Sequence, residues 1–254
     1  MNPPMERYRH ITWEVTGNTG LLSLGPPPEN LLAEPDFIPL ETLAGWTSGR
    51  ELKGIIIHGQ GRHFSSGADR ENLFHMIRSG VDLEGKMNAG KAVLAHIASL
   101  DIPVIAAVQG VCFGGGLEVA LACHIRICAE NALFAFPESS LGLIPGLGGT
   151  VMISETTRPL EALRLLLSGD MINAEEALRS GIADRIVPVK ELLPYCQTLL
   201  RKMTSDRPIG VIHAVMESLR NATTQKREDA MLRETELFCI LAKKEWERRQ
   251  TEGS

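Results

Sequence analysis

Residues 113–120 read FGGGLEVA and continue into LACHIRI at 121–127. Glycine is a poor helix former, yet the apolar run behind the three glycines is typical of a buried helix. A helix that begins here would point free backbone N–H groups and the positive end of its dipole at whatever precedes it. That arrangement suits an anion or a developing oxyanion. For a single glycine cluster, tight packing of a helix start against a strand is the alternative.

Two more junctions of this kind occur in the chain. The three junctions are HFSSGAD at 63–69, QGVCFGGGLE at 109–118 and FPESSLGLIPGLGGT at 136–150. Each of the three follows a short β-branched run of the sort that forms strands buried on both faces. Those runs lie at 54–58, 103–108 and 124–129. Loops after strands often carry functional residues, so we expect the site at these junctions.

The rest of the pattern predicts helices between and after the strands. Apolar residues recur at helical spacing over 88–100, 160–167, 174–179 and 192–203, with Asn173 as the N-cap of the third segment. Strand and helix in alternation predict an α/β fold with crossover connections. The charged tail at 227–250 carries one apolar stripe, which indicates a helix packed on its own domain or a contact between subunits.

Composition excludes several classes of function. The 254 residues carry a formal net charge of -5, which argues against nucleic acid as a partner. The chain shows no long apolar stretch and no leader pattern, so we expect a cytoplasmic protein without a membrane partner. The five cysteines are odd in number and lack a CxxC pair, which favours reduced core thiols. HExxH, GxSxG, Walker A and GxGxxG motifs are absent.

Two carboxylates stand beside the glycine junctions. Glu118 follows the third glycine among apolar neighbours, and Glu138 lies between Pro137 and two serines. A carboxyl group in an apolar setting holds its proton more firmly, which suits general acid or base catalysis near neutral pH. Either one alone could be a charge that favours a helix start. Two of them beside glycine-rich junctions favour a catalytic role.

The three junctions, in order and spacing, carry a resemblance to a known family. Three parts of the chain resemble the crotonase superfamily of enoyl-CoA hydratases and isomerases. They are HFSSGAD, the block from IPVIAAV to GLGGT at 102–150, and EALRLLLSGDMINAEEALRSGIADRIVP at 161–188. The resemblance implies an α/β spiral of repeated ββα units. It further implies a crotonase core over 1–200 and a C-terminal helical region over 201–254, used to form a homotrimer or a dimer of trimers.

The resemblance also implies a chemistry. An acyl-CoA thioester would place its carbonyl oxygen between the backbone N–H groups of Ala68 and Gly115, which stabilise an enolate-like oxyanion. Glu118 would hold or deprotonate water and Glu138 would exchange a proton with the α-carbon. No metal or redox cofactor is needed, since coenzyme A enters as part of the substrate. Hydration of an enoyl-CoA, or the reverse dehydration, is the predicted reaction.

Further substrate contacts follow from the same resemblance. They are expected at Ser66, Gly67, Asp69, Gly114, Phe136, Leu143 and Gly146. Core packing is the alternative for Phe136 and Leu143, and loop fixation by backbone hydrogen bonds is the alternative for Asp69. His63 could contact phosphate or adenine or be merely solvated, and His124 is expected to be structural.

Departures from the family pattern leave some questions open. The N-terminal turn GPPPENLL at 25–32 lacks the usual base that binds CoA phosphates, so a carrier-protein thioester stays possible. Arg70 stands where an apolar residue is common. An isomerase, decarboxylase or hydrolase, or a non-catalytic binding protein of the same fold, remains the alternative function.

Overall fold

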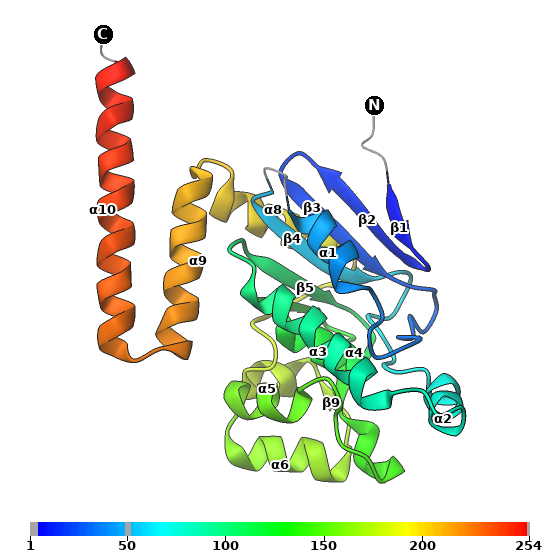
Figure 1. The fold of residues 1–254 in the computed structure, drawn as a ribbon. Coiled ribbons are helices and arrows are strands. Elements are labelled where there is room, and N and C mark those ends of the chain that lie inside the picture. Colours follow the sequence, from blue (N-terminus) through cyan, green and yellow to red (C-terminus); the bar gives the residue numbers. More distant parts are fainter. Residues whose placement is uncertain (1–4, 49–51, 253–254) are drawn as a thin grey trace.

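The chain folds around one large sheet with helices on both faces. The computed structural model describes residues 5–48 and 52–252, so the parts of the two predicted regions that fall on 1–4, 49–51 and 253–254 lie outside it. Figure 1 shows the sheet beside α3 and α4, while α9 and α10 stand at its side.

Seven strands form the main sheet in the spatial order β1, β2, β3, β4, β5, β7, β10. Strands β1 to β3 pair antiparallel, and every pair from β3 to β10 is parallel. The strands are β1 (Glu6–Tyr8), β2 (Ile11–Thr16), β3 (Thr19–Leu24), β4 (Gly54–Gly59), β5 (Val104–Val108), β7 (Ile125–Ala129) and β10 (Arg185–Val187). The three runs expected as strands are confirmed as β4, β5 and β7.

The central strands are buried on both faces, as their continuous apolar runs predict. On β4, Ile55 and Ile57 join the larger core cluster with α3 and α4. Ile56 points to the opposite face, where it joins a second cluster with Leu200 of α8. This alternation follows from the two-residue period of a strand.

A second, small sheet lies at the predicted junctions: one of its strands falls inside the junction at 109–118, and another ends directly before the junction at 136–150. Its strands are β6 (Val111–Phe113), β8 (Leu133–Ala135) and β9 (Ile172–Asn173), with β6 parallel to β8. Each is only two or three residues long, too short to show a period in the sequence. The chain therefore passes from a main-sheet strand to a small-sheet strand and then to a helix, as in β5, β6 and α4 (Gly115–Ala122). Repetition of this unit is the ββα spiral that the resemblance implies.

The helices predicted after the glycine run and over 88–100, 160–167, 174–179, 192–203 and 227–250 are confirmed, whereas those over 40–47, 70–78, 149–156 and 209–224 were not predicted. The helices are α1 (Leu40–Thr47), α2 (Arg70–Arg78), α3 (Leu83–Ser99), α4, the short η1 (Pro137–Leu141), α5 (Gly149–Thr156), α6 (Pro159–Ser168), α7 (Ala174–Ser180), η2 (Val189–Glu191), α8 (Leu192–Thr204), α9 (Ile209–Thr224) and α10 (Arg227–Glu252). Asn173 caps α7 in a capping box with Glu176, which confirms that prediction.

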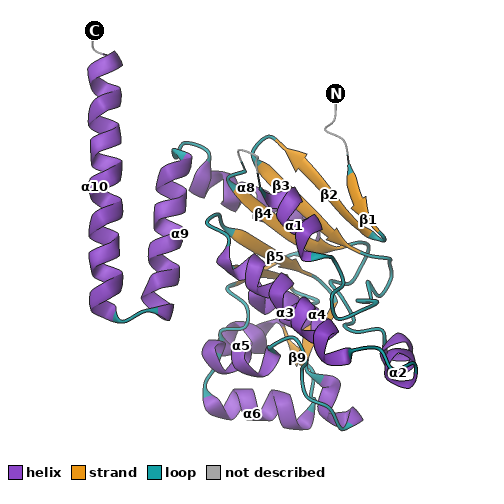
Figure 2. Ribbon diagram, in the orientation of Figure 1, coloured by secondary structure: helices purple, strands orange, loops and turns teal. Residues whose placement is uncertain are grey.

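The last two helices form an arm at the edge of the molecule. Figure 2 shows α10 outermost, beside α9 and apart from the sheet. Arg233 of α10 pairs with Glu217 of α9 at 2.7 Å, and Leu241 approaches Gly210. Several large apolar side chains of α10 are exposed: Met231, Leu232, Phe238, Ile240 and Trp246. The tail is thus a helix, but it packs on α9 rather than on the sheet.

Two further predictions meet the structure here. All five cysteines are free and four are buried, while Cys239 of α10 is exposed. None of the helices in the described part of the chain has both the length and the hydropathy needed to cross a bilayer. A cytoplasmic location stays a prediction.

Candidate active site

A cavity of about 170 Å³ opens where the three glycine junctions meet. The carboxyl ends of parallel strands gather at one edge of a sheet, which brings these junctions together. The cavity is lined by Leu32, Ala33, Glu34, Pro35, Ala68, Asp69, Leu73, Met76, Ile77, Leu83, Met87, Gly115, Glu118, Glu138, Leu143, Ile144, Gly146 and Leu147. Seven of the predicted site residues are among them.

The two predicted oxyanion donors lie side by side. A Cβ atom built on Gly115 would be 3.8 Å from the amide nitrogen of Ala68, and one on Gly67 would be 3.4 Å from the amide nitrogen of Gly115. Neither the Ala68 nor the Gly115 amide donates a hydrogen bond to another described residue. Gly115 is the first residue of α4, so its N–H has no intrahelical acceptor. Two unpaired donors at one place suit an oxyanion.

Gly114 and Gly116, on either side of Gly115, each lie where a Cβ atom would come too close to a neighbouring residue. Gly114 has φ +49°, a conformation that side chains disfavour, and a Cβ atom on it would lie 2.6 Å from Oε1 of Glu138. A Cβ atom on Gly116 would lie 2.7 Å from the backbone oxygen of Ser65. The first glycine thus makes room for a carboxyl group, and the third makes room for the neighbouring junction.

Glu118 is a buried carboxyl group with one oxygen fixed. Its side chain leaves the first turn of α4 in a residue that is only 2% exposed. Oε1 accepts hydrogen bonds of 2.7 Å from the amides of Leu147 and Gly149. Burial raises the pKa of Glu118 to about 7, although both amide bonds oppose the rise; the charge of Glu138 adds to it. The carboxyl group can therefore hold or release a proton near neutral pH.

Glu138 faces the same cavity from η1. Its Oε2 is buried and has no hydrogen-bond partner among the described residues. Burial raises the pKa of Glu138, while the hydrogen bond from its own amide and the charge of Arg70 act in the other direction. A carboxyl oxygen without a partner in a cavity is free to exchange a proton with a bound molecule.

Both carboxyl groups approach the glycine junction. Glu138 Oε1 lies near the Cβ position of Gly114, and Glu118 Oε2 lies 3.9 Å from the Cβ position of Gly115. A carbonyl group held by the amides of Gly115 and Ala68 would therefore have both carboxyl groups nearby. The arrangement can polarise a carbonyl, remove or add a proton beside it, and activate water.

Other predicted residues hold the loops of the site. The Gly67 amide donates to the Ser65 hydroxyl at 3.1 Å, and the Ser66 amide donates to the carbonyl of Glu29 at 2.8 Å. Asp69 caps α2 by accepting from the Asn72 amide, as the loop-fixing alternative predicts, and it also lines the cavity. Neither Ser66 nor Gly67 lines the cavity itself.

Phe136 and Leu143 differ in their positions. Leu143 and Gly146 line the cavity. Phe136 is fully buried in the core cluster, and its ring lies 2.9 Å from the Cβ position of Gly149. The structure thus favours the packing alternative for Phe136, because its side chain packs at the start of α5 and does not line the cavity.

His63 and His124 both accept hydrogen bonds from backbone amides. The Val111 amide donates to Nδ1 of His63 at 3.0 Å, and the Val104 amide donates to Nδ1 of His124 at 3.0 Å. His63 does not line the cavity. His124 is structural, as predicted.

The apolar wall of the cavity was missed at the sequence level. It comes mainly from α2, through Leu73, Met76 and Ile77, and from the first turns of α3. The sequence RENLFHMIR places apolar residues at helical spacing behind the N-cap Asp69, and that signal was sufficient to predict α2.

A comparison of the sequence with known families agrees with this geometry. A sequence model of the enoyl-CoA hydratase/isomerase family matches residues 40–253. The chain belongs to this family.

Two relatives in the enoyl-CoA hydratase/isomerase family illustrate its range. The fatty acid oxidation complex subunit alpha of Idiomarina loihiensis is 38% identical over 226 residues, which are 85% of this chain but only 32% of that protein. The carnitinyl-CoA dehydratase of Salmonella enteritidis is 34% identical over 206 residues, 80% of this chain and 77% of that one. The family match and these names support a crotonase-type reaction on an acyl-CoA thioester.

Solved structures share the fold of this chain. An enoyl-CoA hydratase from Bacillus anthracis superposes with a TM-score of 0.83 at 25% identity, over 91% of this chain and 90% of that one. DspI of Pseudomonas aeruginosa gives 0.80 at 26% identity, over 93% and 90%. The crotonase fold is therefore established for this family member.

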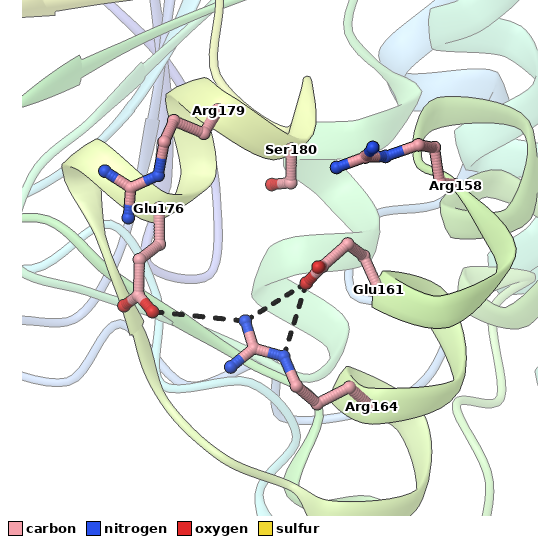
Figure 3. A pocket seen from close by; sticks show the side chains of 6 residues that line it. All are labelled: Arg158, Glu161, Arg164, Glu176, Arg179 and Ser180. Carbon is pink, nitrogen blue, oxygen red and sulfur yellow. Dashed lines mark hydrogen bonds and ion pairs between the residues drawn. The ribbon is translucent and has the colours of Figure 1, made fainter.

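A second hollow of about 410 Å³ lies between α6 and α7 and has a different character. Figure 3 shows three arginines, two glutamates and a serine around it, with Arg164 between Glu161 and Glu176. No predicted site residue lines it. Its charges are largely paired, which distinguishes it from the cavity with the two buried carboxyl groups.

Proposed function

We propose that the protein is an enoyl-CoA hydratase or dehydratase, a hydro-lyase that adds water across the α,β-double bond of an acyl-CoA or removes it. One observation carries the proposal: two carboxyl groups with raised pKa flank a pair of unpaired backbone N–H groups in one cavity. Other reactions of the family need the amide pair, but hydration also needs one group for water and one for the α-proton.

The thioester oxygen would accept hydrogen bonds from Ala68 and Gly115. As the double bond is attacked, negative charge develops on this oxygen, and two fixed donors stabilise it without reorganisation. Removal of one such donor typically costs about 100- to 1000-fold in rate. The positive end of α4 acts in the same direction.

The two carboxyl groups divide the proton transfers. The amides of Leu147 and Gly149 hold Oε1 of Glu118, so Oε2 is the oxygen that can take a proton from water. The hydroxide that results bonds to the β-carbon. Glu138 gives its proton to the α-carbon, so that one water molecule is added. Glu118 then releases its proton to solvent and Glu138 takes one up, which restores both carboxyl groups. Dehydration is the same path in reverse.

Two features bear on the substrate. One relative named above, carnitinyl-CoA dehydratase, has a CoA thioester in its name. This supports coenzyme A rather than a carrier protein as the group that carries the acyl chain. The N-terminal turn lacks the usual basic residue, so other residues would bind the phosphates of coenzyme A.

The arm supports a proposal about assembly. We propose a homotrimer, or a dimer of trimers, built through α9 and α10. The exposed apolar side chains of α10 support it, as does an apolar groove of about 950 Å³ between α9 and the core. Light scattering that gave the mass of one chain would contradict it.

Turnover of enoyl thioesters tests the reaction. Purified protein is mixed with crotonyl-CoA and with longer, aromatic and cyclic enoyl-CoA thioesters, and loss of the enoyl absorbance is followed. Hydration of at least one is expected. Absence of turnover with all of them, carrier-protein thioesters included, would refute the proposed reaction.

A further inference from the structure

Glu34 and Asp69 also line the cavity, but most of its wall beyond the four carboxyl groups consists of apolar side chains. They come from α2, from α3 and from the loop after η1, and they are Leu73, Met76, Ile77, Leu83, Met87, Leu143, Ile144 and Leu147. A wall of this kind stabilises an apolar group and disfavours a charged one, since a buried charge without a partner is costly. The acyl group is the part of the substrate that fits it.

Met87 of α3 covers Gly146 at this wall. A Cβ atom built on Gly146 would overlap the Cε methyl group of Met87, and its only other close neighbour is the sulfur of the same side chain, at 3.6 Å. The next residue is Leu147, whose amide holds Glu118. The Met87 methyl group thus lies beside the segment that fixes a catalytic carboxyl group.

The backbone of α3 cannot withdraw from this contact. Gly90, one turn after Met87, packs so closely on the carbonyl of Pro35 that a Cβ atom there would overlap the oxygen. Lys86, next to Met87, forms an ion pair of 2.7 Å with Glu34. Both contacts hold α3 against the segment 34–35, so the space at the apolar wall depends mainly on the side chain of Met87.

We propose that Met87 and Gly146 together set the length of acyl group that the site accepts. The inference rests on the proposed function, because it takes the ligand to be an acyl-CoA. Met87 is a specificity-determining residue that narrows the cavity, and Gly146 is small because the Met87 methyl group occupies its outer face. An unbranched thioether can change rotamer, so the limit is adjustable by substitution.

Three variants separate this proposal from general damage. Met87→Ala removes three heavy atoms and lengthens the apolar cavity. Gly146→Ala pushes the flexible end of Met87 into the cavity and shortens it, without a clash against backbone. In the double variant the new methyl group at residue 146 has space, so the cavity is again long.

The readout is chain-length preference, measured in two ways. Calorimetry gives the Kd of butanoyl-, hexanoyl-, octanoyl- and decanoyl-CoA, and absorbance gives kcat/KM for the matching enoyl-CoA thioesters. One methylene in an apolar pocket is worth about 10- to 200-fold in discrimination. We expect Met87→Ala to raise the decanoyl-over-butanoyl preference about tenfold or more, Gly146→Ala to lower it by a similar factor, and the double variant to resemble Met87→Ala.

Matched controls and the outcomes complete the test. Gly45→Ala, in α1 with open space at its Cβ position, and Met5→Ala, at an exposed methionine, should leave the preference unchanged. Thermal unfolding of each variant confirms that it folds.

If Met87→Ala and Gly146→Ala both keep the wild-type preference within about twofold, the proposal is overturned. Shifted Kd values without any hydration would support the length limit and refute the reaction, whereas failure to bind every thioester would refute both.

Discussion

At the scale of single residues, the site depends on the different environments of three neighbouring glycines. Gly114 has positive φ and adjoins Glu138, Gly115 offers its N–H beside Ala68, and Gly116 packs on Ser65. The sequence indicated that the cluster brings a backbone N–H to a ligand, and the resemblance pointed to Gly115. The separate reasons for the other two glycines require the packing, which no local pattern shows.

The raised pKa of Glu118 predicts a pH dependence of stability. The folded-state pKa of about 7 exceeds the ordinary value of 4.5 for a glutamate, so the folded state binds more protons than the unfolded state between these limits. Stability should therefore fall as pH rises from about 4.5 to 7, by about 3 kcal/mol in total for this group. Glu118→Gln removes the burial cost of the charge and keeps an acceptor for the two amides.

Thermal unfolding at a series of pH values measures this effect. We expect Tm of the wild type to drop relative to that of Glu118→Gln as pH rises through the window, with the two closest at the acid end. Parallel Tm curves would contradict the raised pKa. Glu161→Gln, in the hollow between α6 and α7, is a control at a paired surface carboxylate.

At the scale of elements, the cap of α7 is both predicted and observed, and it can be tested. The Asn173 side chain accepts from the Glu176 amide at 2.9 Å, and the Glu176 side chain accepts from the Asn173 amide at 3.1 Å. Asn173→Ala should cost about 1 kcal/mol in the free energy of unfolding. Chemical denaturation measures it. Asn173→Ser keeps an acceptor and should lose less, and equal losses for the two variants would argue against the cap.

Long apolar runs and the glycine junctions were predictable, whereas short elements were not. Runs such as 54–58 have the length and β-branched composition of a buried strand, and β4 confirms it. Strand β6 lies inside the junction at 109–118, and β8 ends directly before the junction at 136–150. Each has three residues, so only their pairing identifies them. Helix α2 was not predicted, although its cap and its apolar face could have indicated it, because its composition is polar. Without α2, the acyl wall of the site could not be predicted.

At the scale of the whole molecule, the arm of α9 and α10 leaves apolar surface without a partner in one chain. Phe238 of α10 is 70% exposed. A charge at its position would oppose burial in a subunit contact, because a charge is costly to bury without a partner. We therefore expect Phe238→Asp to lower the mass measured by light scattering from that of a trimer or hexamer toward that of one chain.

The control for this prediction carries the same charge elsewhere. Thr251→Asp places it near the polar end of α10 and should leave the mass unchanged. A wild-type mass of one chain would contradict the assembly itself. An unchanged mass for Phe238→Asp would show that this side chain lies outside the contact.

The central claim is that Glu118 and Glu138 act as a pair on a thioester held by Ala68 and Gly115. The most direct measurement is kcat for hydration of the best enoyl-CoA by wild type, Glu138→Gln and Glu118→Gln, with Glu161→Gln as the control. General acid–base groups contribute about 100- to 10,000-fold, so each site variant should lose kcat by a factor in this range while the control keeps it. Full activity in Glu138→Gln would contradict the account.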